Sequence, residues 1–417
     1  AVSEVVQQNP NVGMYVQDEW KLNSDLTLNA GVRYDLQFLE SINTDLDNIS
    51  PRVGMAWSPV DDRRTIVRGS AGMFYDRVPL RAVANALLSA GNTTDLTQLR
   101  QISVSLSPAQ APAPVFPRIL DAPSPSVTLP TLTTMDRDLQ NAVSQQAGVE
   151  IEREIRSSMV IGIGYQYTRG RQLLMSINQN VPSCVAEGSN NGCRPYPEYG
   201  NNNRYSSAGS SSYHGMHVSL TQLPGRWGHY RVSYTLSSAR NNVGEFFFSS
   251  PIDPFDLSKD WGRSDNDQRH RLVLSGTAQS PTTPAGNGWE TLTRNWQLSG
   301  LLQAYSALPF NITSGVTTIQ GTAGRPVVNG QFIERNAGEG SDFFSLGLRV
   351  SRTFHLTSRI GLEALAEAYN VTNRENVLTR NTNFGSASYP GNPSPNFGQP
   401  TAVGEPRSFQ LGGRLRF

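Results

Sequence analysis

Apolar and polar residues alternate along many short stretches of this chain. The clearest stretch is "DLTLNAGVRYDLQF", residues 25–38. Its apolar positions are Leu26, Leu28, Ala30, Val32, Tyr34, Leu36 and Phe38. Because side chains of a strand point alternately to its two faces, this pattern predicts a strand with one apolar and one polar face. Its length of roughly 13 residues suits a tilted strand that crosses a lipid bilayer and projects beyond it.

The same alternation recurs along the whole chain and predicts an all-β fold of about thirteen strands. The predicted strand centres lie near residues 16, 31, 54, 70, 149, 163, 218, 234, 274, 300, 349, 365 and 412. The pattern is weaker near residues 54, 70 and 274 than elsewhere.

The predicted connections are alternately short and long. Tight turns fall at residues 23–24, 60–63, 156–157, 224–228 and 356–358, with a moderate connection at 280–293. Long loops fall near residues 77–142, 170–212, 240–268, 307–341 and 371–404, and the one near 39–49 is modest. An up-and-down barrel of the bacterial outer membrane has this asymmetry, because its periplasmic turns are short and its extracellular loops long. A soluble propeller or solenoid, which is the alternative, has no reason to keep it.

Composition narrows the class of protein further. A net charge of +1 does not favour nucleic-acid binding, which normally needs a basic excess. Mean hydropathy is -0.39, and no stretch approaches the ~20 apolar residues of a membrane-spanning helix. The chain begins at Ala1 without an initiator Met or a signal peptide, so we expect a mature or truncated piece.

The final segment, "RSFQLGGRLRF", alternates up to the last residue. Phe409, Leu411, Leu415 and Phe417 share one face of the predicted strand. If short turns are periplasmic, this strand ends at the periplasmic edge, where a terminal aromatic suits the interfacial girdle. The pattern resembles the C-terminal signal that the outer-membrane assembly machinery reads. An ordinary edge strand that happens to end in Phe is the alternative.

Several segments together resemble one family. They are "MYVQDEWKLNSDLTLNAGVRYD", "ISPRVGMAWSP", "VRGSAGMFYDR", "YHGMHVSLTQ", "RVSYTLSSARNN", "DQRHRLVLSG" and "GLEALAEAYNVTNREN". In this order they resemble the C-terminal barrel half of TonB-dependent receptors of the Oar-like subgroup. The resemblance implies an antiparallel up-and-down transmembrane β-barrel, with about 13–14 strands present out of about 22. We find no plug, TonB box or N-terminal domain, so we expect residues 1–417 to be the C-terminal portion of a longer receptor; a standalone barrel of about fourteen strands is the alternative.

The resemblance also implies a function. Such a receptor takes up a small-molecule, saccharide or peptide ligand across the outer membrane of a Gram-negative bacterium. Its partners would be outer-membrane lipid and, through a plug, an inner-membrane energy-coupling complex; we expect a monomer without cofactor, catalytic or metal residues. A passive channel and a surface adhesion or assembly protein remain as alternatives.

Charged residues on the polar faces are candidates for lining the lumen. Glu150, Glu152 and Glu154 share one strand face, and they form either a cation path or a lining neutralised by arginines such as Arg68, Arg231 or Arg349. The other candidates are Arg33, Asp35, Arg349, Glu363 and Glu367. Side chains two apart on a strand lie roughly 7 Å apart, and no companion nucleophile or base stands near the carboxylates, so no catalytic pair is predicted.

Acidic residues are concentrated in "DPFDLSKDWGRSDNDQRHR", residues 253–271. Only Asp265 and Asp267 approach the spacing of a calcium loop, so an extracellular loop that re-enters the barrel is the preferred interpretation. Asp267, Arg269 and His270 resemble a segment of the family and imply a structural hydrogen-bonding cluster at the strand rim. His214 and His217 are three residues apart and therefore fall on opposite faces of a strand, which argues against a shared metal.

The two cysteines, Cys184 and Cys193, bracket "VAEGSNNG" in a loop that we place outside the cell. A disulfide suits that oxidising location and would stabilise by about 2–3 kcal/mol in the chain-entropy model. A zinc pair is the competing hypothesis.

The loop 77–142 contains two kinds of sequence. "VPLRAVANALLSAGN" predicts a short amphipathic helix with Val83, Leu87 and Leu88 on one side. A Pro-rich stretch follows at 107–130, and the two together suggest a lid or a merely decorative loop. Four tyrosines, at 196, 199, 205 and 213, could bind a ligand, but girdle or loop packing is the preferred interpretation.

Overall fold

The computed structural model of the chain describes residues 6–90, 131–184, 193–244, 250–280, 293–316, 318, 324–357 and 359–417. The Pro-rich stretch 107–130 and most of the connection 280–293 lie outside these described residues. No helix in the described part of the chain is long and apolar enough to cross a membrane.

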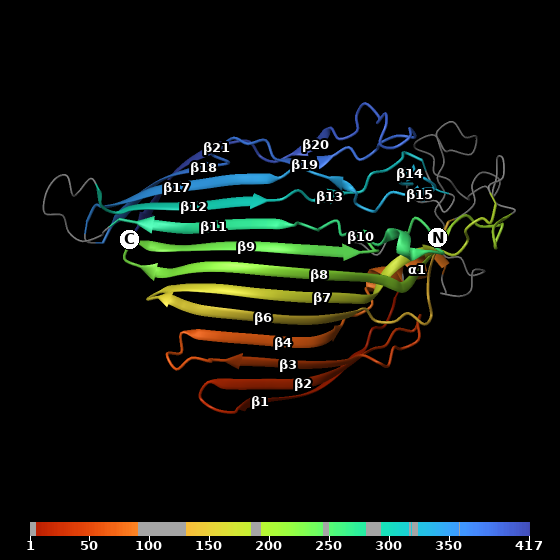
Figure 1. Cartoon of the computed structure of the whole chain (residues 1–417), viewed down its shortest axis with the longest axis horizontal. Helices are drawn as coiled ribbons and strands as arrows, with labels where there is room; N and C mark the ends of the chain where they lie inside the picture. Colours follow the sequence, from red (N-terminus) through yellow and green to blue (C-terminus); the bar gives the residue numbers. More distant parts are fainter. Residues whose placement is uncertain are drawn as a thin grey trace.

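Thirteen antiparallel strands form one continuous sheet. They are β1 (Asn11–Lys21), β2 (Leu26–Gln37), β3 (Ile49–Trp57), β4 (Thr65–Tyr75), β6 (Val143–Arg156), β7 (Met159–Asn178), β8 (Asn202–Gly225), β9 (Gly228–Asn241), β11 (His270–Gln279), β12 (Trp296–Tyr305), β17 (Phe343–His355), β18 (Gly361–Tyr369) and β21 (Ser408–Arg416). Each strand pairs with the next along the chain in this list, as an up-and-down meander (Figure 1). Every predicted strand centre falls inside one of these strands, so the predicted all-β meander is confirmed.

Smaller elements occupy the connections. They are α1 (Leu80–Ala90), β5 (Leu132–Met135), η2 (Leu257–Asp260), β10 (Gly262–Arg263), β13 (Pro309–Phe310), β14 (Val327–Val328), β15 (Gln331–Phe332), β16 (Gly338–Glu339), β19 (Val377–Arg380) and β20 (Pro400–Val403). All of them lie between strands that the long connections join, and Figure 1 shows these connections gathered at one end of the sheet. We call this the long-connection end; the tight turns and the C-terminus lie at the opposite, short-turn end.

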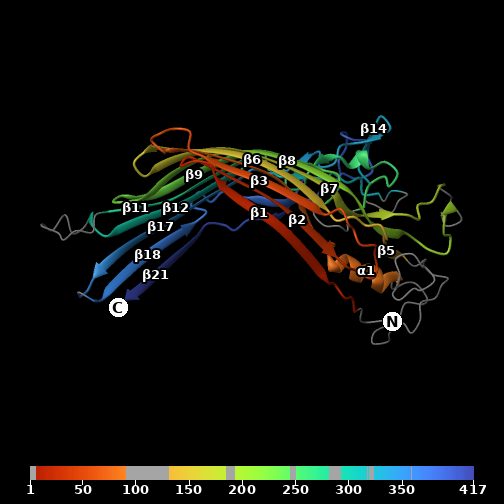
Figure 2. The ribbon, with the colours of Figure 1, turned by 90° about the horizontal axis from the view of Figure 1, so that it is seen from below.

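The sheet is an arch rather than a closed barrel (Figure 2). Among the described residues, β1 and β21 each pair on one side only, which leaves an open edge at each end of the strand order. An open edge carries unpaired backbone N–H and C=O groups, which are costly in hydrocarbon.

The register keeps one face of the arch largely apolar and the other largely polar along the thirteen strands. On the first three strands, for example, Val16 pairs with Val32 and Val32 with Pro51, while Tyr15 pairs with Arg33 and Arg33 with Ser50. Helix α1 lies on the concave side of the arch (Figure 2). Gln37 belongs to the polar face, and its side chain accepts from Val78 N (2.8 Å) and donates to Val78 O (3.3 Å), just before α1 begins, so the polar face is the concave one.

The predicted amphipathic helix is present as α1, and it forms the main apolar core of the described residues. Ala82, Val83 and Ala86 are fully buried against Met135 of β5 and Tyr205 of β8. Alanines at this spacing favour a helix, and their small side chains let the helix pack closely against β5 and β8. Tyr205 is thus a packing residue, which agrees with the preferred interpretation for this one of the four tyrosines.

The predicted loop 170–212 is much shorter in the structure. β7 continues to Asn178 and β8 begins at Asn202, so both strands run beyond their neighbours at the long-connection end. The register between β7 and β8 is irregular between Gly170 and Leu174, and this irregularity interrupts the alternation of apolar and polar residues. The sequence pattern therefore did not predict the last part of β7.

Candidate functional site

The apolar convex face changes character in steps toward the long-connection end. One cross-strand row is Ile163, Val218, Tyr234 and Leu272. Two rows further along lie Tyr167, His214 and Ser238, and the row after that is Arg169, Ser212, Arg240 and Arg263. An apolar band followed by aromatic and then cationic side chains is the order expected at a membrane interface.

Two tyrosine–histidine pairs mark this interfacial zone. Tyr165 Oη lies 2.7 Å from His214 Nδ1, and Tyr234 Oη lies 2.8 Å from His270 Nδ1. These bonds satisfy polar atoms on an otherwise apolar face. His217 points to the concave face, so the two histidines that are three residues apart are separated as expected.

The glutamate row on β6 belongs to the concave face, and each glutamate has a polar partner on a nearby strand or turn. Glu152 forms an ion pair with Arg68 of β4. On the other side, Glu150 Oε1 lies 3.2 Å from Nε2 of His217, which sits two strands away on β8. The histidine ring reaches across Gly164 of β7, where any Cβ would collide with it.

The arginine partners of this glutamate row were predicted only in part. Glu154 accepts a hydrogen bond from Ser158 N (3.3 Å) at the adjoining turn. Arg231 lies on β9 and Arg349 on β17, at least three strands from β6, so neither answers the glutamates. The order of strands in the sheet decides which polar side chains become neighbours. The alternation within each strand does not reveal that order.

A second charged network joins the last strands near the short-turn end. Glu363 of β18 is almost fully buried, with a side chain 3 % exposed. Its carboxylate contacts Arg349 at 3.2 Å, Arg416 at 2.9 Å and Arg414 at 3.8 Å. Arg349 also pairs with Glu367 at 3.4 Å. The network therefore ties β21, which carries Arg414 and Arg416, to β17 and β18.

Arg33 and Asp35 form a third, local pair on the concave face of β2. Their Nη2 and Oδ1 atoms are 2.6 Å apart, and Nε of Arg33 donates to Oδ2 at 2.7 Å. Two positions apart on one strand, they neutralise each other without help from another strand.

The C-terminal residues lie as the alternation requires. Phe409, Leu411 and Leu415 pair with Ala368, Ala366 and Leu362 on the apolar face. Phe417 follows the strand and is 91 % exposed. Nothing in the fold needs its ring for packing, and its role as an assembly signal stays a prediction.

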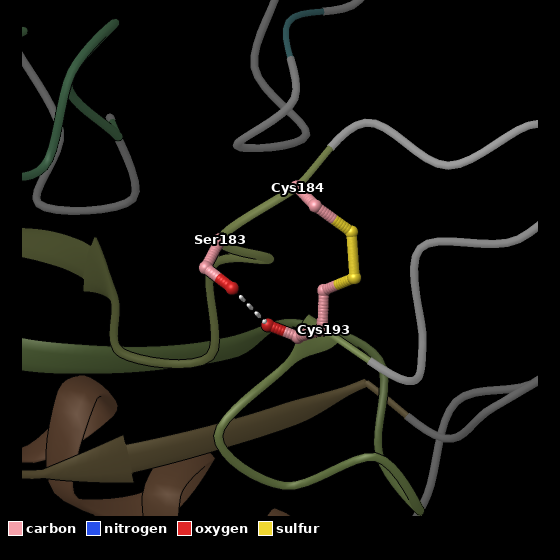
Figure 3. Close-up of a disulfide and its surroundings, with 3 residues drawn as sticks. All are labelled: Ser183, Cys184 and Cys193. Carbon is pink, nitrogen blue, oxygen red and sulfur yellow. Dashed lines mark hydrogen bonds between the residues drawn. A yellow bond between two sulfur atoms is a disulfide. The ribbon is translucent and has the colours of Figure 1, made fainter.

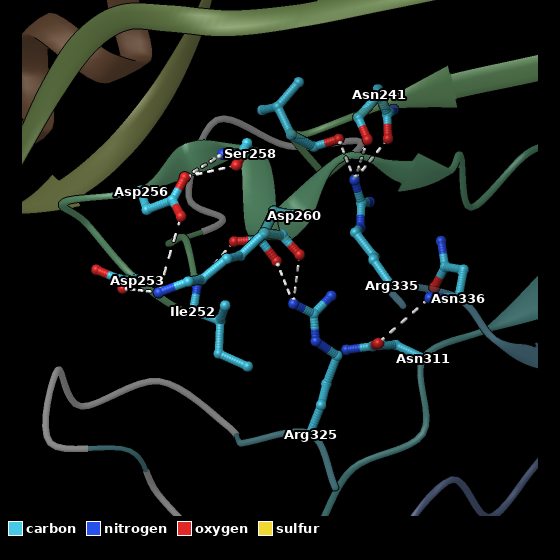
Figure 4. Close-up of polar contacts among 12 residues, drawn as sticks. Asn241, Ile252, Asp253, Asp256, Ser258, Asp260, Asn311, Arg325, Arg335 and Asn336 are labelled. Carbon is cyan, nitrogen blue, oxygen red and sulfur yellow. Dashed lines mark hydrogen bonds and ion pairs between the residues drawn. The ribbon is translucent and has the colours of Figure 1, made fainter. Parts of the chain in front are cut away.

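A polar cluster at the long-connection end was not foreseen from the sequence (Figure 4). Buried Arg325 donates from Nη2 to Asp260 Oδ1 (3.2 Å) and to the Lys259 carbonyl (2.7 Å). Asp260 Oδ2 in turn accepts from Ile252 N at 2.7 Å. Burial raises the pKa of Asp260 and lowers that of Arg325. The pair fastens the connection between β9 and β11 to the connection between β12 and β17.

Arg335 reinforces the same contact between connections. Its Nη2 lies 3.0 Å from Asp265 Oδ2, and its Nη1 donates to Asn241 Oδ1 (2.5 Å) and Val243 O (3.1 Å). A cavity of about 310 Å³ lies beside these groups. The acids of 253–271 were visible in the sequence, but nothing in the pattern indicated arginine partners some seventy residues away.

The segment containing Asp267, Arg269 and His270 does form a hydrogen-bonded rim. Asp267 is buried, accepting from Arg263 Nε at 2.8 Å and from Ala239 N at 2.7 Å. His270 instead bonds Tyr234 on the convex face. Among the described residues, no group of three His, Cys, Asp or Glu side chains could hold a metal ion.

Cys184 and Cys193 are joined by a disulfide, with Cα atoms 5.7 Å apart (Figure 3). Ser183 beside it donates to the Cys193 carbonyl from its backbone N (2.9 Å) and from Oγ (3.0 Å). Together these bonds close the base of the connection between β7 and β8.

Comparison with known proteins places the chain in a class. A family model described as "Outer membrane beta barrel domain" matches residues 1–41 and 40–334. The chain therefore belongs to this family of outer-membrane β-barrels. The match agrees with the alternating sheet and locates the protein in the outer membrane of a Gram-negative bacterium.

A curated relative adds detail to this class. The TonB-dependent transporter Oar of Myxococcus xanthus is 38% identical over 80 residues, which are 18% of this chain and 8% of Oar. The resemblance to Oar-like TonB-dependent receptors is thus confirmed over that stretch.

Solved structures share the fold at low sequence identity. The outer membrane transporter YddB from Escherichia coli superposes with a TM-score of 0.63 at 13% identity, covering 98% of this chain and 45% of YddB. A mutant of the ferric enterobactin receptor PfeA from Pseudomonas aeruginosa gives 0.56 at 12% identity, with 98% and 45% covered. The FrpB iron transporter from Neisseria meningitidis gives 0.52 at 12% identity, also with 98% and 45%. The chain spans less than half the length of these transporters, and its arch has the fold of part of their barrels.

Proposed function

We propose that this chain forms part of the barrel wall of a TonB-dependent transporter that takes up a ligand across the outer membrane. One observation carries the proposal: thirteen successive strands keep a single apolar face, and the long connections all meet at one end. A membrane wall needs both properties, and the interfacial rows on the convex face support it.

The long-connection end faces the cell exterior in this proposal, and the short-turn end faces the periplasm. Further strands of the longer protein complete the barrel by pairing with the open edges of β1 and β21. The chain covers only 45% of YddB, which leaves room for those strands and for a plug.

The concave face lines the transport path, and the connections catch the ligand. The path is polar and charged, which suits a hydrated ligand better than a lipid. FrpB is an iron transporter and PfeA a ferric enterobactin receptor, so iron complexes belong among the candidates with saccharides and peptides. Energy would come from the inner-membrane complex acting on the plug, and the wall itself would catalyse no reaction.

Uptake by the native organism tests the proposal. A strain lacking the full-length gene and a complemented strain are given a defined mixture of ferric siderophores, cobalamin, oligosaccharides and peptides. We expect the complemented strain alone to deplete at least one compound, and to stop when an uncoupler collapses the proton gradient. Depletion that persists with the uncoupler would indicate a passive channel. Equal depletion by both strains, with loss of surface attachment in the mutant, would indicate an adhesion protein.

A further inference from the structure

Charges on the concave face are sorted into sectors. The sector of β4, β6, β7 and β8 holds the Glu150 and Glu152 pairs, and the sector of β17, β18 and β21 holds the Glu363 network. Between them, the concave positions of β9, β11 and β12 include no acidic residue.

Two arginines of this central sector lack an acidic partner. Among the described residues, neither Arg231 nor Arg271 forms an ion pair, and both side chains are exposed on the concave face. The Arg271 guanidinium lies over the Tyr305 ring, 4.8 Å from its centroid, which holds it against the wall. In each of the other concave-face clusters described above, every arginine contacts a carboxylate.

The two guanidiniums belong to one groove. A hollow of about 580 Å³ is lined by Arg231 and Arg271 together with Ser233, Thr235, Ser237 and Ser275. Arg231 pairs in register with Ser275, and Arg271 is four residues further along β11. The Cα atoms of the two arginines therefore lie roughly 14 Å apart along the strand direction, and hydroxyl-bearing residues lie between them.

We propose that this groove binds oxyanion groups of the transported ligand: carboxylate, phosphate or sulfate. Arginine forks recognise such groups with two parallel hydrogen bonds, and the hydroxyls donate additional bonds. Because the two arginines follow each other along the wall, an anionic ligand can pass from Arg271, near the long-connection end, to Arg231. The inference rests on the proposed function and names the chemical class of its ligand.

Cysteine chemistry on the purified full-length receptor tests the inference. Val273→Cys places a thiol in the groove, and Gln166→Cys places a matched thiol in the sector of Glu150; the two cysteines of this chain are joined in the disulfide. Each is reacted with a negatively and a positively charged methanethiosulfonate. For each thiol we take the ratio of its reaction rate with the negative reagent to its rate with the positive reagent. We expect this ratio to be about tenfold higher at Val273→Cys than at Gln166→Cys. The ratio at Val273→Cys should fall about fivefold when Arg231→Gln and Arg271→Gln are introduced together.

Protection by citrate supplies the second readout. Citrate should slow labelling at Val273→Cys, the double Gln substitution should abolish that protection, and neutral maltose should not protect. Arg240→Gln, on the opposite face of β9, should leave both readouts unchanged. Equal rate ratios at the two thiols, no protection by citrate, or a thiol that reacts with neither reagent would overturn the proposal. Gel mobility without heating checks that each variant is folded.

The two proposals fail separately. If the wild-type strain takes up a ligand and the double Gln substitution leaves uptake unchanged, the anion groove is wrong and the transporter stands. If no ligand is taken up while the labelling contrast holds, the proposed function is wrong.

Discussion

Oε2 of Glu363 lies 2.9 Å from Nη2 of Arg416, and this ion pair joins the last strand of the chain to its neighbour. Two more arginines, Arg349 and Arg414, contact the same carboxylate. A single buried acid thus neutralises positive charge from both β17 and β21, near the point where the chain ends.

Glu363→Gln should loosen the last strand. The substitution leaves three arginines around a neutral amide, and we expect a loss of about 1–3 kcal/mol, less than for a fully buried pair because Arg416 is more than half exposed. Urea unfolding of the full-length protein in lipid vesicles measures the change. Glu367→Gln is the control, and its effect should be smaller, since among the described residues Glu367 forms an ion pair with one arginine, Arg349, besides accepting a hydrogen bond from Tyr369. Equal losses of unfolding free energy in the two variants would show that Glu363 contributes no more to the stability of the last strands than Glu367 does.

Phe417→Ala should reduce the amount of protein assembled in the outer membrane several-fold. The ring is 91 % exposed, so its removal should change the unfolding free energy of the purified protein by less than about 0.5 kcal/mol. Loss of assembly without loss of stability would indicate recognition of the terminus. Phe255→Ala, at a phenylalanine of a long connection that is 81% exposed, should leave assembly intact. Normal assembly of Phe417→Ala would show that Phe417 is not needed as an assembly signal.

Adjacent residues on β11 separate the two faces. Leu274 belongs to the convex face and Ser275 to the concave face. We expect Leu274→Arg to cost about 2–4 kcal/mol in a lipid bilayer, because the guanidinium would enter hydrocarbon, and Ser275→Arg to cost much less. Unfolding in vesicles measures both. The reverse order would mean that the convex face does not contact lipid.

The folded connection that contains Asp260 should become more stable in mild acid. Burial raises the Asp260 pKa above its ordinary value of 3.8, so the native state binds a proton that the unfolded chain releases. The stability that Asp260 contributes to the folded connection therefore rises as pH falls through the native pKa toward 3.8, and does not change with this group at higher pH. Limited proteolysis of the connection at several pH values measures this, and Asp260→Asn should abolish the pH dependence. Easier cleavage in acid would contradict the direction.

The sequence predicted the strands well because each carries its own period-two signal. It failed where a contact depends on strand order or on a distant connection. Glu150 and His217 are 67 residues apart, and they meet only because Gly164 between them has no side chain. Arg325 and Asp260 meet across two long connections that share no pattern. Residues 171–178 of β7 were missed because a register irregularity interrupts their alternation.

The most direct test is to measure which end of the sheet faces the cell exterior. Phe255→Cys lies in a long connection, where the side chain is 81% exposed, and Trp227→Cys lies in a tight turn, where it is 64% exposed. Intact cells that express the full-length protein are treated with a membrane-impermeant maleimide. We expect Phe255→Cys to be labelled at once, and Trp227→Cys only after the outer membrane is permeabilised. Labelling of Trp227→Cys in intact cells, or of both positions equally, would contradict a membrane wall with its long connections outside.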